Sequence, residues 1–445
     1  MVKLQILTTY FVIGLRIDLL VCFTLRNLHL MKIQKNWVYY VVAALALVYI
    51  YFEAQRINDF HIFYSSSQDY FAGKNMYEIR YQTWNHYLYS PFFAILMYPL
   101  TCLPYEMAHF IWLSIGLVCL VFIFKRIRFF IHGEKPYTKT DWIITFIMLI
   151  IASRFIRDNF HFGQSTFVIL FTCTEGVYQC LKGRYLLAGL LFGLGINIKI
   201  MPLVFIPWLF VRGYYKVLGY MILFLSVFYI LPALVTGWEQ NQTLLSSWSA
   251  LLNPARPIHL LDIDENSYHS ISSLMPALFT DLKNNDSPDV RRHILLLDHS
   301  TVVLISNITR ALVILLTLCV LVKKWFQPVE PSPLFARELA YIFLATPLVF
   351  PHQQVYAFLF ALPAIALIMY ELWKTENKKL RNKLIAVIIV FALCVNLGLW
   401  LGEFKPVFEH YKIVTYGALL MLVTVLLLMP KNEPHFGKLS AGSAQ

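Results

Sequence analysis

The chain contains few charged residues and no recognisable arrangement of cysteines. Only 14% of its 445 residues are charged, whereas 58% are hydrophobic. A soluble domain carries about a quarter charged residues to cover its surface, so this composition excludes an ordinary soluble enzyme and a disordered chain. The seven cysteines form no CxxC pair and no Cys/His cluster with zinc spacing. A P-loop, a Rossmann glycine pattern and a zinc-protease motif are also missing.

Apolar runs take the place of these features. A membrane span needs about 20 mostly apolar residues, and the sequence predicts an all-α, polytopic transmembrane protein with about 11–13 spans. The twelve candidate spans are 37–54, 105–124, 141–156, 163–181, 185–198, 200–211, 216–236, 301–322, 336–350, 354–372, 384–401 and 411–429. Residues 91–103, which are interrupted by prolines, predict a helix on the membrane surface.

The distribution of Lys and Arg predicts the orientation of these spans. If residues 55–104 lie outside, the inside segments carry 21 basic and 7 acidic residues, whereas the outer segments from Glu53 onward carry 13 basic and 17 acidic residues. The net charge of +12 therefore records orientation, and we expect no nucleic-acid partner. This topology leaves two long extracytoplasmic loops, 55–104 and 237–300, and predicts a site at the outer face of a plasma (inner) membrane.

Residues 1–30 do not fit this pattern, because their apolar stretch contains Arg16 and Asp18. The sequence Met31-Lys32-Ile33-Gln34-Lys35 resembles a natural start before a first span. We expect residues 1–30 to be a doubtful extension, residues 31–430 to form a single membrane domain and residues 431–445 to form a short cytoplasmic tail.

The first outer loop contains the leading catalytic candidate. Asp59 comes a few residues after the first span, at a depth where a carboxylate is costly unless it has a partner. It is either a solvated helix end beside Arg56 or a general base that accepts a proton from a hydroxyl. The same loop contains Tyr77 and Tyr89, which are candidates for substrate binding.

Cations in outer turns oppose the orientation rule and therefore need a reason. Arg154, Arg157 and Lys199 lie in such turns, where a bound phosphate is a natural partner. The alternative is an ion pair, such as Arg157 with Asp158. His352, in a turn that follows Pro351, is either a structural hydrogen-bonding residue or a group that donates to a leaving oxygen.

The remaining candidates lie in a tight turn and in the second outer loop. Gln164 follows Gly163 in the turn after Arg157, and Asn266 and Ser267 belong to a polar stretch that suits sugar hydroxyls. Asp262 and Asp264 have a spacing that could hold a metal, but two carboxylates at this spacing are common by chance. We therefore expect no metal and no cofactor.

The order of these motifs resembles glycosyltransferase family 87, whose members are polyprenol-phosphate-mannose-dependent mannosyltransferases of the GT-C membrane fold. The resemblance covers residues 37–400. It rests on the sequence motifs that follow the first span, namely Asp59, Gly73-x-x-x-Tyr77, Tyr89-Ser90-Pro91-Phe92, Gly163-Gln164, Lys199-x-x-Pro202 and Asn266-Ser267. The chain departs from the family pattern at Glu265-Asn266-Ser267 and at His352-Gln353-Gln354.

The resemblance implies a catalytic aspartate at Asp59, a role for His352 beside the site and a polyprenyl phosphate sugar donor. It predicts transfer of a hexose, most simply mannose, with inversion to a lipid or glycan acceptor of the cell envelope. The main alternative is a transporter or a lipid or glycan flippase. That alternative requires polar groups within several spans, whereas the polar residues of this chain gather on one side.

Overall fold

The computed structural model describes residues 35–81, 85–253, 256–263, 265–283, 287–322 and 325–428. The extension 1–30, the start at Met31 and the tail 431–445 lie outside the described residues. The chain divides into two compact units, residues 1–55 and residues 56–445. The expectation of a single domain over residues 31–430 stays a prediction. The first unit contributes helix α2 (Lys35–Ala54), which is apolar from Tyr40 to Ala54 and counts among the shorter apolar helices.

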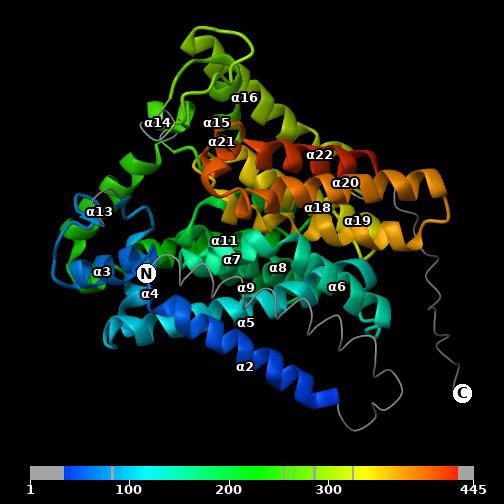
Figure 1. Cartoon of the computed structure of the whole chain (residues 1–445). Helices are drawn as coiled ribbons and strands as arrows, with labels where there is room; N and C mark the ends of the chain where they lie inside the picture. The colour runs from blue at the N-terminus through cyan, green and yellow to red at the C-terminus, as the bar shows by residue number, and fades with distance from the viewer. Residues whose placement is uncertain are drawn as a thin grey trace, which may run out of the picture. The chain divides into compact units, whose positions relative to one another are not determined.

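The second unit is almost entirely helical (Figure 1). Its first part contains α3 (Phe60–Phe71), a two-stranded antiparallel sheet of β1 (Arg80–Tyr81) and β2 (Asn85–His86), and α4 (Pro91–Thr101). The central helices are α5 (Tyr105–His132), α6 (Lys139–Ile151), α7 (Ser153–His161), α8 (Thr166–Leu181), α9 (Tyr185–Ile198), η1 (Met201–Val204), α10 (Phe205–Val211), α11 (Tyr215–Ile230) and α12 (Ala233–Thr236).

The rest of the second unit contains the second long loop and the C-terminal helices. The loop folds into α13 (Trp238–Leu252), α14 (Pro257–Leu260) and α15 (Ile271–Phe279). The C-terminal helices are α16 (His299–Leu315), α17 (Thr317–Val320), α18 (Pro333–Val349), η2 (Val355–Ala361), α19 (Leu362–Lys374), α20 (Lys378–Asn396), η3 (Leu397–Leu399), η4 (Gly402–Phe404), α21 (Lys405–His410) and α22 (Ile413–Leu427).

The core is formed where two groups of helices meet. Every residue of α18 from Phe335 to Val349 is buried, as are all residues of η2. Helices α18 and α19 pack on α5, and α5, α8, α9 and α11 pack successively on one another. Glycines permit this close packing: a Cβ on Gly189 of α9 would lie 2.6 Å from the Cβ of Tyr220 in α11. This packing fixes the ends of α9 and α18, which lead into the turns that contain Lys199 and His352.

The helices confirm an all-α, multi-pass membrane protein, but fewer of them are full-length spans than the sequence suggested. Among the described residues, five helical segments are long and apolar enough to cross a membrane, or six if the pair Gly402–His410 and Ile413–Leu427, bent by 57°, is one span. Helices α8 and α9 have 16 and 14 residues, or about 24 and 21 Å, and are too short to cross alone. The expected surface helix at 91–103 is α4.

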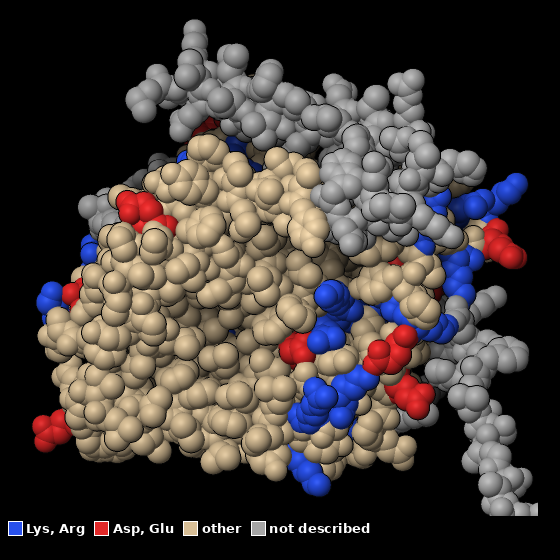
Figure 2. Space-filling view, turned by 90° about the horizontal axis from the view of Figure 1, so that it is seen from below, with Lys and Arg blue, Asp and Glu red and all other residues tan. Residues whose placement is uncertain are grey.

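Charged residues gather in limited areas of the surface. Figure 2 shows a face made mainly of uncharged residues, with a large group of Lys, Arg, Asp and Glu on the right and a few more along the left edge. Several of the basic residues assigned to the inside form ion pairs with acidic residues of neighbouring helices. The pairs are Arg126–Glu175 at 2.6 Å, Arg128–Asp141 at 3.4 Å, Lys182–Glu134 and Arg212–Glu338. In the Arg128–Asp141 and Arg212–Glu338 pairs both side chains are buried, so each charge there compensates the other.

Candidate active site

Asp59 lies in the turn that leads into α3 and is fixed there by its neighbour Asn58. The amide of Asn58 donates a 2.8 Å hydrogen bond to the carbonyl of His161 at the end of α7, and its side-chain oxygen accepts one from the backbone N–H of Phe60. Asp59 precedes α3 but makes no side-chain capping bond to it. The carboxylate is therefore directed away from its own helix and towards the turn after α7.

Gly163 makes this approach possible. Its φ of 64° is in the left-handed region, and a Cβ at this position would lie 2.7 Å from the side-chain oxygen of Asn58. The indole N–H of Trp112 donates a 2.9 Å hydrogen bond to the Gly163 carbonyl and fixes the turn. Gln164, which is buried, then donates its side-chain amide to the Asp59 carboxylate. The structure thus brings together two residues, Asp59 and Gln164, that the sequence assigned to one site.

The surroundings of Asp59 raise its pKa to about 6. Burial is the main cause, the negative charge of Glu265 adds to it, and Lys199 and the Gln164 hydrogen bond oppose it. Burial likewise lowers the pKa of Lys199 to about 8, and Asp59 opposes that shift. In the part of the chain that the structure describes, the side-chain ammonium of Lys199 makes no hydrogen bond or ion pair, although its backbone N–H donates to the Gly195 carbonyl. The site therefore contains a carboxylate that titrates near neutral pH and a half-buried cation that is available for a ligand.

Glu265 is a site residue that the sequence reasoning did not select. Its carboxylate accepts hydrogen bonds from Gln354 at 2.6 Å, from Ser267 at 2.8 Å and from the Tyr268 hydroxyl at 3.2 Å. The only signal in the sequence was its place beside Asn266 and Ser267. Ser267 therefore orients Glu265. The Asn266 side chain instead accepts from Ser287 at 2.9 Å, and the Asn266 carbonyl accepts from Lys412 at 2.8 Å.

Tyr77 and Tyr89 form an aromatic support next to the carboxylate. The Tyr77 hydroxyl donates a 2.7 Å hydrogen bond to the carbonyl of Tyr89, so Tyr77 positions Tyr89 through the backbone. The ring of Tyr89 lies edge-on against Phe63 of α3, with 4.8 Å between centroids. Burial raises the pKa of the Tyr89 hydroxyl, and the Asp59 charge raises it further. Tyr89 is thus a neutral hydrogen-bonding group close to Asp59.

The two arginines of α7 differ in their environment. Arg154 is 1% exposed, and its guanidinium lies 2.9 Å from Glu409 and 3.5 Å from Asp158. The Arg157 side chain is 50% exposed and lies 2.9 Å from Asp158, which is the ion pair considered as the alternative to a phosphate contact. Arg154 is therefore occupied by two carboxylates, whereas the guanidinium of Arg157 is partly open to solvent.

His352 occupies the turn between α18 and η2, with a positive φ of 56°. Its backbone N–H donates a 2.7 Å hydrogen bond to Asp262, and its ring Nδ1 lies 2.7 Å from the other oxygen of that carboxylate. The loop with Asp262 is joined to this turn by the pairing of Tyr268 with Gln354. Asp262 thus holds His352, and Asp264 lies outside the described residues. Among the described residues, no group of three or more His, Cys, Asp or Glu side chains could hold a metal ion.

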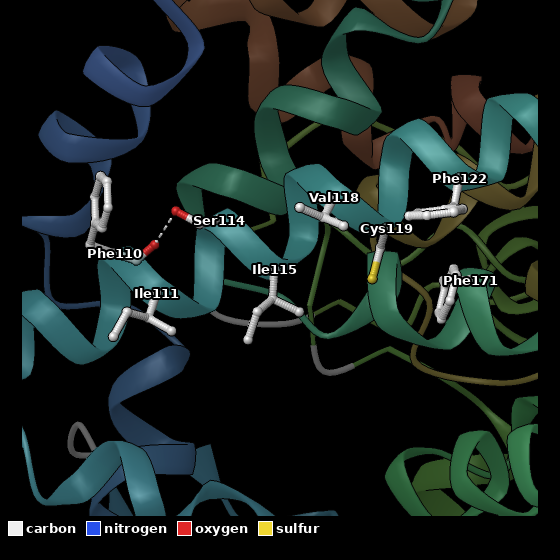
Figure 3. Close-up of a pocket in the computed structure, with 8 residues that line it drawn as sticks. All are labelled: Phe110, Ile111, Ser114, Ile115, Val118, Cys119, Phe122 and Phe171. Atoms are coloured by element: carbon white, nitrogen blue, oxygen red, sulfur yellow. Dashed lines mark hydrogen bonds between the residues drawn. The ribbon is translucent and has the colours of Figure 1, made fainter. Parts of the chain in front are cut away.

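An apolar groove of about 410 Å³ follows α5, lined among others by Phe110, Val118 and Phe171 (Figure 3). Its one hydroxyl, that of Ser114, donates a 2.7 Å hydrogen bond to the Phe110 carbonyl of its own helix. Apart from Ser114 and the free thiol of Cys119, the lining is hydrocarbon, so the groove suits hydrocarbon chains.

Comparison with known proteins matches the family model of glycosyltransferase family 87 over residues 87–351. This range includes Gln164, Lys199 and Glu265 but ends before His352 and excludes Asp59. The chain is also similar to the polyprenol-phosphate-mannose-dependent alpha-(1-2)-phosphatidylinositol pentamannoside mannosyltransferase of Mycolicibacterium smegmatis, with 28% identity over 169 residues. That alignment spans 37% of this chain and 40% of the length of the relative.

The family match covers more than half of the chain and agrees with its all-α membrane fold. The resemblance noted in the sequence is therefore confirmed: the chain belongs to glycosyltransferase family 87 and is an integral, multi-pass membrane glycosyltransferase.

Proposed function

We propose that this enzyme transfers a mannosyl group from a polyprenyl phosphate to a hydroxyl of a lipid or glycan acceptor, with Asp59 as the general base. The observation that carries the proposal is the proximity of Asp59, whose pKa is about 6, to Lys199, which is half-buried and whose ammonium makes no hydrogen bond or ion pair among the described residues. Transfer from a sugar phosphate requires a base that deprotonates the acceptor hydroxyl. It also requires a cation that stabilises the leaving phosphate. The name of the mycobacterial relative supports mannose and the polyprenyl carrier.

The reaction follows from these two groups. The Asp59 carboxylate removes the proton from the acceptor hydroxyl while the oxygen of that hydroxyl attacks the anomeric carbon. The bond from that carbon to the phosphate oxygen breaks, and its electron pair stays on the departing polyprenyl phosphate. One in-line displacement inverts the anomeric configuration, so a β-linked donor gives an α-linked product. Gln164 holds the carboxylate in place for this step.

The leaving phosphate gains negative charge, which Lys199 and Arg157 stabilise. Fixed cations in a partly dry site lower the energy of the charge that develops in the transition state. Arg154 was predicted to assist them. Its two ion pairs favour a supporting role, in which it holds Asp158 and so orients Arg157. His352, which Asp262 orients in the turn between α18 and η2, would also stabilise the leaving phosphate.

The proposed site faces the extracytoplasmic side of the plasma membrane. The support is the charge asymmetry of the loops, together with the fact that turns predicted on one side supply Asp59, Gln164, Glu265 and His352. Tyr89 and Glu265 provide hydrogen-bonding groups for the sugar and acceptor hydroxyls.

The test is a transfer assay with purified protein, polyprenyl phosphate mannose and a lipid extract, in which mass spectrometry identifies the product. We expect a mannosylated lipid or glycan, and none from Asp59→Asn. Asp289→Asn, which removes an exposed carboxylate from the second outer loop, is the matched control and should retain full activity. Full activity of Asp59→Asn would refute the mechanism. Movement of the lipid across vesicles without covalent transfer would support the flippase alternative.

A further inference from the structure

A charged residue, Arg310, lies in the middle of an apolar candidate span. It is the twelfth of the 22 residues of the span His299–Val320. At 1.5 Å per residue, Arg310 is about 15 Å from either end of this span, so its side chain cannot extend into water beyond the membrane. An arginine at this depth is costly unless it has a partner, and such a residue typically marks a functional site.

The printed contacts of Arg310 are all with neutral groups. Its Nε donates a 2.8 Å hydrogen bond to the carbonyl of Val349, and its Nη1 donates one of 3.3 Å to the side-chain oxygen of Asn307. Within the described ranges, Nη2 makes no hydrogen bond and the guanidinium makes no ion pair. Asp262 is near enough for its charge to act on Arg310, but its carboxylate holds His352. The cation therefore has no carboxylate in contact with it.

Arg310 lies beside the turn that contains His352. Val349 is the last residue of α18 and leads into that turn, and α16 packs on α18. Arg310 is half-buried, whereas Asn307, one turn earlier on α16, is exposed. The two side chains therefore lie at the edge of the buried face of α16, where a lipid headgroup can reach them from the plane of the membrane.

We propose that Arg310 and Asn307 bind the phosphate of the lipid-linked donor where it enters the site from the membrane plane, beside the turn between α18 and η2. The inference rests on the proposed function for the identity of the lipid. The Asn307 oxygen accepts from Arg310, so the amide N–H groups of Asn307 and the Nη2 of Arg310 are left to donate to phosphate oxygens. The phosphate supplies the negative charge that the protein does not place against Arg310.

The same helix offers apolar side chains to the hydrocarbon chain of this lipid. Leu304, Ile308 and Leu312 are 59%, 58% and 53% exposed. They follow one another at a spacing of four residues and therefore lie along one face of α16. A lipid bound through its phosphate at Arg310 can keep its hydrocarbon chain in the membrane beside this face.

Thermal unfolding of the purified full-length protein in detergent micelles tests the site without turnover. Polyprenyl phosphate without a sugar should raise the melting temperature of the wild type, whereas polyprenol, which has no phosphate, should not. Arg310→Gln should weaken binding of polyprenyl phosphate by about tenfold or more, as expected for loss of charge-assisted hydrogen bonds. Arg310→Lys, which keeps the charge, should bind within about threefold of the wild type. Arg184→Gln, at an exposed arginine before α9, is the matched control and should bind normally.

Two results would overturn the inference. One is equal affinity of the wild type and Arg310→Gln for polyprenyl phosphate. The other is an equal loss of affinity for phosphatidylglycerol, which would show a general lipid contact rather than a donor site. If Arg310→Gln does not fold, Asn307→Ala takes its place: it leaves the arginine intact and should weaken binding of polyprenyl phosphate by about threefold or more.

Transfer kinetics separate this inference from the proposed function. Arg310→Gln should raise the KM for polyprenyl phosphate mannose by about tenfold and leave kcat within about twofold, because the contact is made before the chemical step. A fall in kcat at an unchanged KM would contradict the entry role. If no variant transfers mannose while Arg310 still governs binding of polyprenyl phosphate, the proposed function fails and the phosphate site stands.

Discussion

Replacing Glu265 by Gln and Lys199 by Met should move the acidic limb of the pH–activity profile in opposite directions. Both charges act on Asp59: Glu265 raises the pKa of that carboxyl and Lys199 lowers it. If Asp59 must be ionised to accept a proton, activity follows its ionised fraction. With a pKa of about 6, this fraction is about one tenth at pH 5 and about nine tenths at pH 7. The wild-type rate should therefore rise by about tenfold between these values.

The size of the shifts follows from the charge interactions. A single charge in a partly buried site interacts by roughly 1–2 kcal/mol, which corresponds to about one pKa unit. Glu265→Gln should lower the midpoint of the acidic limb by about one unit, and Lys199→Met should raise it by a similar amount. Lys199→Met should also depress the whole profile, because it removes a proposed phosphate contact. The midpoint and the height therefore report different roles of the same lysine.

The assay measures kcat/KM for mannosyl transfer from pH 4.5 to 8, because this ratio reports the ionisation of the free enzyme. Glu239→Gln, which neutralises an exposed carboxylate on α13, is the matched control and should leave the midpoint unchanged. A Glu265→Gln profile that coincides with that of the wild type would refute the reasoning, since Asp59 would then not be the titrating group or would not sense Glu265.

Three further predictions concern stability and geometry. Asp59→Asn should raise the melting temperature at pH 7.5 but not at pH 4. The folded-state pKa of about 6 lies above the ordinary value of 3.8, so ionisation of Asp59 costs the native state about 3 kcal/mol well above pH 6 and nothing below about pH 4. Equal melting shifts at pH 7.5 and pH 4 would contradict this. Gly163→Ala should lower activity by about a hundredfold or more, because the added Cβ would meet Asn58. Gly183→Ala, at a similar φ of 72° but with no atom within 4 Å of the added Cβ, should retain activity. Equal losses of activity in the two variants would contradict the role of the Gly163 turn in positioning Asp59. Arg154→Gln should destabilise the fold by about 3–5 kcal/mol in thermal unfolding, since it leaves buried carboxylates uncompensated, whereas Arg157→Gln should melt normally and show a raised KM for the donor.

The sequence predicted the helical fold and the side-by-side placement of several turns. Apolar runs located the helices, and their alternation assigned Asp59, Gln164 and Lys199 to the same side of the membrane. The structure brings these residues into one site. Composition could not give the lengths of the helices. Helices α8 and α9 lie in mainly apolar stretches but end early, because turns at Gly183 and Lys199 interrupt them.

Contacts between distant segments were beyond prediction. Arg154 and Arg157 are two arginines on one short helix. Only Arg154 forms an ion pair with Glu409, which lies 255 residues away in the sequence, and this contact helps to give Arg154 a structural role. Glu265 acquires its contacts only when its loop pairs with the turn at His352. No local pattern encodes that pairing, so Glu265 was not selected.

The assembly of the site from Asp59, Gln164, Lys199, Glu265 and His352 has a consequence for biogenesis. About 290 residues separate the first of these from the last, and at about 5–20 residues per second the ribosome needs roughly 15–60 s to make them. During that interval the nascent chain already carries the Asp59 carboxylate without the turn that completes the site. The candidate site therefore stays incomplete until the turn at His352 has been made, when about four fifths of the 445 residues have been synthesised.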